Sequence, residues 1–358
     1  MSTNVSVRWR RCPGLLALVL LLAASAAWAD QVTPNDRVSS RLLVRSEAKS
    51  DAEIVGYLKT HDKVPLIKTT GAWREVKLPD TTGFVASSYS TVIPDGIPES
   101  PATAVTLPMP AGANLLGNRH VLLGIPLDAD PSDDFLIDRK YWVASYNQGR
   151  LVPNWVAWSL SATDMGTTGR AGDFHQDDDL PASFRRVRTE DYTNSGYQRG
   201  HQCPSNDRTT TLDANNATFL MTNMQPQTGE LNHGPWQRSE EWEQALARSG
   251  KHLLIIAGGV FTAQSTKISS GVAIPDASYK IAVVLEPGQT AADVTTQTIV
   301  CAFIMPNRRD VKKKCYDYLV SVDEVEKRTG YDFLRDVPDN VEKVIEAKVP
   351  TPQECGAP

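Results

Sequence analysis

The sequence has no apolar run long enough to cross a membrane, no C-x-x-C pair and no excess of basic residues. Its N-terminal apolar run, residues 15–24, falls well short of the roughly 20 residues that span a bilayer, which argues against a membrane anchor. The missing C-x-x-C spacing argues against a structural zinc site. With 37 Lys and Arg against 42 Asp and Glu, the net charge of -5 argues against broad electrostatic binding of nucleic acid.

Residues 1–29 have the organisation of a secretory signal peptide. They contain three arginines and no acid, then the apolar run, then Ala27-Trp28-Ala29, which is a small-x-small cleavage pattern. Cys12 precedes the run, so a bacterial lipid anchor, which needs a cysteine after the run, is not expected. We therefore predict cleavage after Ala29 and a secreted or periplasmic mature chain.

Removal of three arginines changes the net charge from -5 to about -8, so the exported chain is acidic. An acidic total still permits a polyanionic substrate, because positive charge can be confined to a cleft. Four cysteines remain, which permits two disulfides in three possible connectivities. The local pair Cys301–Cys315 is one option, and the other two cysteines are Cys203 and Cys355.

Composition divides the mature chain into two domains. Residues 94–112 contain five prolines and no aromatic residue, as expected of a semi-extended linker. We predict a small domain over residues 30–93, a larger one over 113–350, and a C-terminal tail over 351–358.

The first domain has the pattern of a small all-β barrel, with short strands predicted at 41–45, 54–58, 64–67, 73–78 and 83–85. The order L-x-V-R-S, I-x-G-x-L, G-x-W-x-x-V, G-F-V and S-S-Y resembles the bacterial SH3 family over almost the whole segment. The resemblance implies a module that holds an exported enzyme near a cell-wall ligand, and a folded spacer without a ligand is the alternative. Retention of residues 30–93 on isolated peptidoglycan distinguishes the two.

The second domain mixes strands with helices. Strands are predicted at 141–146, 154–160, 251–261, 279–285 and 298–305, and the last three are apolar runs typical of strands covered on both faces. Ser321 and Glu324 form a capping-box pattern for a helix that ends before Gly330. We predict an α+β domain with a mixed central sheet that carries helices.

The polar stretch from Tyr197 to Trp242 is the candidate active site. His201 is a natural general base, because a neutral imidazole can take a proton from water near neutral pH. Gly200 suits close approach of a ligand or backbone, and Arg199 supplies a planar donor fork that fits phosphate oxygens. A lone histidine would more often be structural, and it is these neighbours that favour catalysis.

Asn232 and Glu240 are candidate ligands of a metal ion. If a helix begins near Pro235, Glu240 lies a little over one turn into it and Asn232 lies just before it, so both can face one pocket. Their oxygen atoms suit magnesium, which often takes only one or two protein ligands. The alternatives are a loop cap for Asn232 and a solvated helix position for Glu240.

Together these residues resemble the DNA/RNA non-specific endonuclease family, the ββα-metal (His-Me finger) nucleases that include secreted bacterial nucleases and mitochondrial endonuclease G. The resemblance covers most of residues 113–340. It is carried by QRGH at 198–201, PS at 204–205, DRT at 207–209, TNMQPQ at 222–227, NHGPW at 232–236 followed by Glu240, and more weakly by GIP at 124–126, YWV at 141–143, PNWV at 153–156 and FIMPN at 303–307.

The resemblance implies metal-dependent hydrolysis of phosphodiester bonds in DNA and RNA. His201 would activate the attacking water as the general base. Asn232 would bind a hydrated Mg²⁺ directly, with Mn²⁺ or another divalent cation as the alternative ion. Glu240 would hold waters of the ion or help orient it.

Three further residues receive roles from the resemblance. Arg199, and by a looser alignment Arg170, would neutralise the charge that grows on the phosphate. Asn223 would steady the site through hydrogen bonds.

The sequence departs from the family pattern at several positions. Gln198 replaces the first aspartate of the motif, and Ser239 and Gln244 stand where leucine and arginine are common, so the loss of a cation at Gln244 is expected to weaken the grip on substrate. Cys203 follows the base by two residues, and packing or disulfide formation is its ordinary role. Two rival functions remain: a cell-wall cysteine peptidase that uses Cys203, and a catalytically weak nuclease-fold binding protein.

Overall fold

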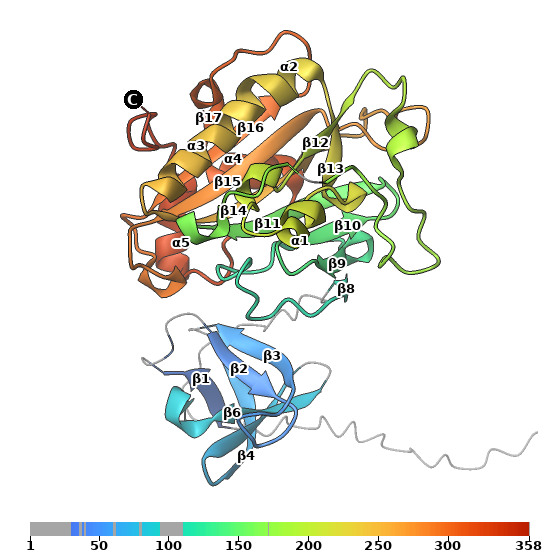
Figure 1. Ribbon diagram of the computed structural model, residues 1–358. Coiled ribbons are helices and arrows are strands. Elements are labelled where there is room, and N and C mark those ends of the chain that lie inside the picture. The colour runs from blue at the N-terminus through green and yellow to red at the C-terminus, as the bar shows by residue number, and fades with distance from the viewer. Residues whose placement is uncertain are drawn as a thin grey trace, which may run out of the picture.

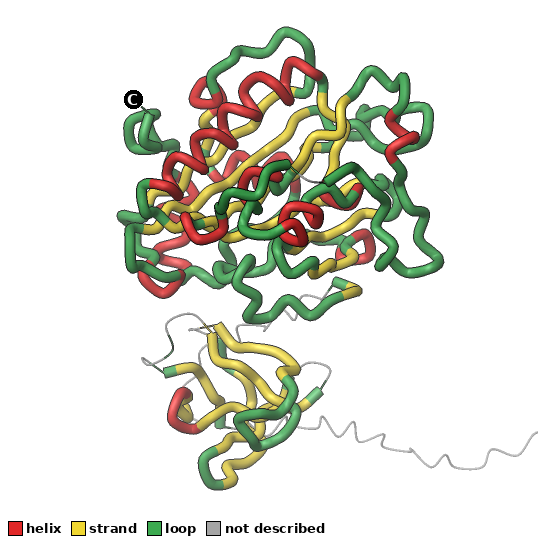
Figure 2. Tube along the Cα trace, in the orientation of Figure 1, coloured by secondary structure: helices red, strands yellow, loops and turns green. Residues whose placement is uncertain are grey.

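The structure is a computed structural model that describes residues 30–35, 38, 41–59, 62–78, 81–93, 110–170 and 172–357. The predicted signal peptide and residues 94–109 of the predicted linker lie outside these ranges, so both stay predictions. In the described ranges, no helix has the length and apolar character needed to cross a membrane. Figure 2 shows a small unit made almost wholly of strands and a larger unit that combines strands with helices.

The N-terminal unit is a seven-stranded antiparallel sheet around a core of valine and leucine side chains. The strand order is β3-β2-β6-β5-β4-β1-β7, in which β1 lies between β4 and β7. All five predicted strands are present, and the prediction missed the first and last. The bounds are β1 Gln31–Pro34, β2 Arg41–Arg45, β3 Ile54–Lys59, β4 Val64–Thr70, β5 Trp73–Lys77, β6 Thr82–Ala86 and β7 Ser90–Ile93.

The second unit is built on an eight-stranded sheet of order β17-β16-β15-β14-β11-β10-β9-β8. Only β8 and β9 pair in parallel, so the sheet is mixed, as predicted. The strands β11, β14, β15 and β16 are almost entirely buried, which confirms that both faces are covered. The bounds are β8 Ala111–Gly112, β9 Phe135–Asp138, β10 Val143–Asn147, β11 Val152–Leu160, β14 His252–Val260, β15 Ala277–Leu285, β16 Ile299–Pro306 and β17 Leu319–Val320.

Helices cover the two faces of this sheet because successive side chains of a strand point to opposite sides. On β14, Ile255 packs in one core with Trp242 of α3, whereas Ile256 packs in the other core with Val325 of α4. Figure 1 shows α3 lying over the sheet, nearly in line with β15 and β16. The helices are α1 Leu212–Ala217, α2 Gly229–Leu231, α3 Gln237–Arg248, α4 Val322–Thr329 and α5 Asp339–Ala347.

The predicted ends of α4 are confirmed. The hydroxyl of Ser321 accepts a hydrogen bond from the backbone N–H of Glu324, which satisfies one free donor of the first turn. Gly330 follows the helix with φ +84°, a left-handed conformation that ends helices and favours glycine.

Among the described residues, a disulfide joins Cys301 on β16 to Cys355 near the C-terminus. The local pair Cys301–Cys315, offered as one option from the sequence, is therefore wrong. Cys315 and Cys203 are free and buried. The indole of Trp242 donates to the backbone oxygen of Cys355 at 2.6 Å, so the C-terminal segment is held against α3 as well as β16. Tertiary packing, rather than separation along the chain, decides the pairing.

Candidate active site

The predicted base and the predicted metal ligands lie on one ββα unit, formed by the paired strands β12 Gln198–His201 and β13 Met224–Gln227 and by α3 (Figure 1). Asn232 lies in the turn before α3, and Glu240 lies in the first turn of that helix. The indole of Trp236 donates to the backbone oxygen of His201 at 3.0 Å. The side-chain amide of Asn232 donates to Oε1 of Gln198 at 2.7 Å. These two bonds join the start of α3 to β12.

The imidazole of His201 lies against two aromatic rings. Its centroid is 5.4 Å from that of Phe174 and 5.0 Å from that of Phe219, which it meets edge-on. Burial, aided by the charge of Arg170, lowers the pKa of His201 to about 3. Its Nε2 is buried and has no hydrogen-bond partner in the described part of the chain. The ring is therefore neutral at pH 7, which is the form that accepts a proton.

Two guanidinium groups flank the same rings. The Cζ of Arg199 lies 4.6 Å from the centre of Phe174, and the Cζ of Arg170 lies 4.7 Å from that of Phe219. Arg199 also has a buried Nε without a hydrogen-bond partner among the described residues. Stacking fixes the planes of both groups and leaves their N–H edges for other partners. Positive charge is thus concentrated beside His201, although the whole chain is acidic.

Gly200 permits the close contact between the two strands of the unit. A Cβ at this position would lie 2.1 Å from Oε1 of Gln227 and 2.3 Å from its Cδ. Gln227 is buried, and its amide donates to Ser278 at 3.1 Å, so the side chain has little freedom to move away. Any larger residue at 200 would displace β12, and with it His201.

Asn223 holds the backbone that follows His201. Its amide nitrogen donates to the oxygens of Cys203 and Thr218, both at 2.8 Å, and its Oδ1 accepts from the N–H of Cys203 at 2.9 Å. The side chain is fully buried, so it cannot reach substrate. A steadying role for Asn223, which the family resemblance implies, stays a prediction that these contacts make possible.

The donor chemistry of Asn232 and Glu240 fits a hard divalent cation. Because Asn232 donates through Nδ2 to Gln198, its Oδ1 remains an acceptor, and no hydrogen bond of the described residues uses it. Burial raises the pKa of Glu240 to about 7, and Lys280 opposes this rise. A half-buried carboxylate and a fixed amide oxygen, both near the start of α3, are the kinds of oxygen ligand that Mg²⁺ prefers.

Behind α3 lies a buried charged network that the sequence prediction missed. The ammonium of Lys280 on β15 is 2.8 Å from Glu243 on α3, and both side chains are fully buried. Lys280 also lies 4.7 Å from the ring centre of Trp236, whose indole holds His201. Burial raises the pKa of Glu243, while Lys280 and its hydrogen bond oppose that rise. No local sequence motif predicts this ion pair. Lys280 lies in an apolar strand, and its partner is known only once the position of α3 on the sheet is known.

Gln244 takes part in the same network and does not face substrate. It is 5% exposed, and its amide donates to Oδ1 of Asp207 at 3.0 Å, while Trp158 donates to the other oxygen at 2.9 Å. The position of Gln244 therefore does not support the prediction that the lack of a cation here weakens substrate binding. Ser239 is also buried and donates to the backbone oxygen of Trp236 at 2.7 Å.

Cys203 is unsuited to nucleophilic catalysis. Its side chain is fully buried, and burial raises the pKa of the thiol, which keeps it protonated. The cysteine-peptidase interpretation therefore lacks an accessible thiolate.

A pair of strands followed by a helix on a mixed sheet, with a histidine ending the first strand, defines a nuclease fold of the ββα-metal class. The chain belongs to the DNA/RNA non-specific endonuclease family, whose model matches residues 128–340, and a bacterial SH3 domain model matches residues 40–91. It is thus a nucleic-acid-hydrolysing endonuclease, in a family that depends on a divalent metal.

Several nucleases resemble the chain. A nuclease of Nostoc sp. is 41% identical over 235 residues, which cover 64% of this chain and 85% of the relative. A mitochondrial nuclease of Saccharomyces cerevisiae is 28% identical over 227 residues, covering 59% and 68%. The crystal structure of an EndoG/EndoGI complex contains a chain with 23% identity and a TM-score of 0.53, covering 63% of this chain and 94% of that one, which supports the fold.

Proposed function

We propose that this protein is an exported endonuclease that hydrolyses DNA and RNA without sequence preference, with His201 as its general base and Mg²⁺ held through Asn232. The observation that carries the proposal is a neutral, half-buried imidazole against two phenylalanine rings on which guanidinium groups stack. The same ββα unit carries an amide oxygen, Oδ1 of Asn232, that no hydrogen bond of the described residues uses. Contact with the phosphate backbone carries little base information, so sequence preference is not expected.

In the proposed reaction, His201 takes a proton from the attacking water. Arg199 and Arg170 place positive charge where the phosphate gains negative charge, and their fixed planes reduce the reorganisation needed. Phe174 and Phe219 limit water around the imidazole and hold its plane.

The residues at the start of α3 would hold the metal ion. Asn232 would bind it through Oδ1, and Glu240 would help to hold it. When bound, the ion supplies Lewis-acid stabilisation of the phosphate and of the departing alkoxide. Gln198 would keep the amide of Asn232 in the orientation that presents its oxygen.

Export and attachment form part of the same proposal. The basic, apolar and small-x-small order of residues 1–29 supports export to the periplasm or the medium. The SH3-like unit would hold the enzyme near a cell-wall ligand, as its match to a bacterial SH3 domain supports.

The proposal is tested by incubating residues 30–358 with plasmid DNA and with RNA, with and without EDTA. Both substrates are expected to be cleaved with Mg²⁺ and to stay intact after chelation. Iodoacetamide is expected to leave the rate unchanged, because both free cysteines are buried. Cleavage that persists in EDTA would exclude the metal, and failure to cut either substrate with Mg²⁺ would favour a binding protein.

Replacing Gln198 by alanine is expected to raise the Mg²⁺ concentration for half-maximal activity by about 10- to 100-fold. The change removes the acceptor that orients the amide of Asn232, while leaving His201 in place. Gln198→Asp, which keeps an acceptor, should stay closer to the wild type. Mg²⁺ titration of the initial rate measures the effect.

Gln237→Ala is the matched control for this substitution. Gln237 lies at the start of α3 and bonds Glu241 on the exposed side of the helix, away from Asn232. Equal Mg²⁺ requirements in Gln198→Ala and the control would show that Gln198 does not orient the ligand.

A further inference from the structure

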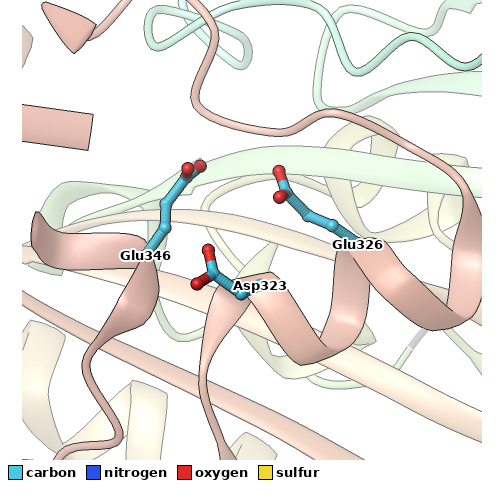
Figure 3. A group of neighbouring side chains, drawn as sticks. All are labelled: Asp323, Glu326 and Glu346. Carbon is cyan, nitrogen blue, oxygen red and sulfur yellow. The ribbon is translucent and has the colours of Figure 1, made fainter. Parts of the chain in front are cut away.

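Three carboxylates converge between α4 and α5, on the opposite sheet face from α3. Asp323 and Glu326 come from α4 and Glu346 comes from α5, and one oxygen of each lies within 4.8 Å of the others. Figure 3 shows the three side chains directed toward one another. They lie outside the proposed active site and have no part in its chemistry.

Glu346 is the member that requires an explanation. It is only 7% exposed, and its Oε1 is buried without a hydrogen-bond partner in the described ranges. Burial raises the pKa of Glu346 to about 9, and the largest charge effects on it come from four acids, Glu326, Glu342, Asp332 and Asp323, which raise it further. A buried carboxylate surrounded by acids needs a proton or a cation.

The positions of the other oxygens are partly fixed by protein contacts. Glu326 accepts a hydrogen bond from the N–H of Phe333 at 2.9 Å, which orients its carboxylate. Glu342, one turn before Glu346 on α5, also has a buried Oε1 without a partner among the described residues. Lys59 of the N-terminal unit opposes the raised pKa of Glu342, whereas the largest charge effects on Glu346 come from acids. Within the described ranges, no salt bridge joins Asp323, Glu326 or Glu346 to a cation.

We propose that Asp323, Glu326 and Glu346 form a structural binding site for Ca²⁺ that links α4 to α5. The donors are all hard carboxylate oxygens, which exclude a soft metal. Oxygens that bind one Ca²⁺ at about 2.4 Å lie no more than about 4.8 Å apart. The three oxygens of this cluster all lie within 4.8 Å of one another. Ca²⁺ fits better than Mg²⁺ because it accepts irregular sets of six to eight oxygens and sheds water more readily.

The site is tested by thermal unfolding of the full mature chain at pH 7.5 after removal of metals, with CaCl₂ as the probe. Ca²⁺ at 100 times its dissociation constant is expected to raise Tm by about 5 °C or more. Glu346→Gln and Asp323→Asn should abolish the rise. Asp323 is exposed, so its substitution leaves the packing intact if Glu346→Gln impairs folding.

Two controls make the result specific to this cluster. Glu324→Gln changes a carboxylate of α4 that pairs with Arg328 outside the cluster, and it should keep the full response to Ca²⁺. Asn232→Ala removes the proposed catalytic ligand and should also keep the response. The proposal is overturned if Ca²⁺ does not change the Tm of the wild-type protein. That result would indicate that protons, rather than a cation, neutralise the cluster. The proposal is also overturned if the rise survives in Glu346→Gln and Asp323→Asn or disappears in Asn232→Ala.

Discussion

Replacing His201 by alanine is expected to lower the rate of cleavage of both DNA and RNA by about 100- to 10,000-fold, the usual contribution of a general base. The pKa of His201 lies well below its ordinary value because the ring is buried against Phe174 and Phe219 beside Arg170. The imidazole is thus available as a proton acceptor across the neutral range, and alanine offers no replacement. Plasmid nicking and RNA hydrolysis at saturating Mg²⁺ measure the loss.

The fold is expected to tolerate this change, since the ring contributes no side-chain hydrogen bond within the described residues. A circular dichroism spectrum and Tm close to the wild type would show that the loss is chemical. His252→Ala, on β14, is the matched control and should keep full activity. Undiminished cleavage by the His201 variant would refute its assignment as the base.

Replacing Lys280 by methionine is expected to destabilise the protein by about 3–5 kcal/mol, the cost of breaking a buried ion pair from one side. The change leaves Glu243 fully buried without its cation. It also removes the main charge that opposes the raised pKa of Glu240 and the second such charge, after Arg208, for Asp207. Urea unfolding measures the effect. The midpoint is expected to fall, while the slope of the unfolding free energy against urea concentration stays unchanged. Activity should fall as well, because Glu243 and Glu240 lie on the same helix.

The double variant Lys280→Met/Glu243→Leu should recover much of this stability, because it removes both buried charges together. Lys251→Met breaks an exposed pair with Glu286 and should cost less than about 1 kcal/mol. A double variant as unstable as the single one would show that Lys280 does not act through its pairing with Glu243.

Local features of the sequence predicted the elements that have local causes. The short strands of the N-terminal unit, the apolar runs of the sheet and the cap of α4 by Ser321 could be predicted, since each depends on neighbours within a few residues. The strands β1 and β7 were missed because they are short and β7 depends on pairing with β1, which in turn pairs with β4. The domain boundaries themselves stay predictions.

The residues of the candidate site divide in the same way. His201, Asn232 and Glu240 were found from their spacing and chemistry, and the structure places them on one unit. Gln244 was expected near substrate but turns inward to Asp207, because the rotation of α3 is set by its packing on the sheet. The direction of the Gln244 side chain therefore could not be predicted from neighbouring residues in the sequence.

By itself, the sequence determined the family and the two kinds of unit and supplied the candidate site residues, because motifs and periodicity are properties of short segments. Tertiary structure alone decided that Cys301 pairs with Cys355, that Lys280 neutralises Glu243, and that three acids meet between α4 and α5. These contacts join residues 54, 37 and up to 23 positions apart. They arise only when helices pack on a completed sheet, where burial makes each unpaired charge costly and each pairing specific.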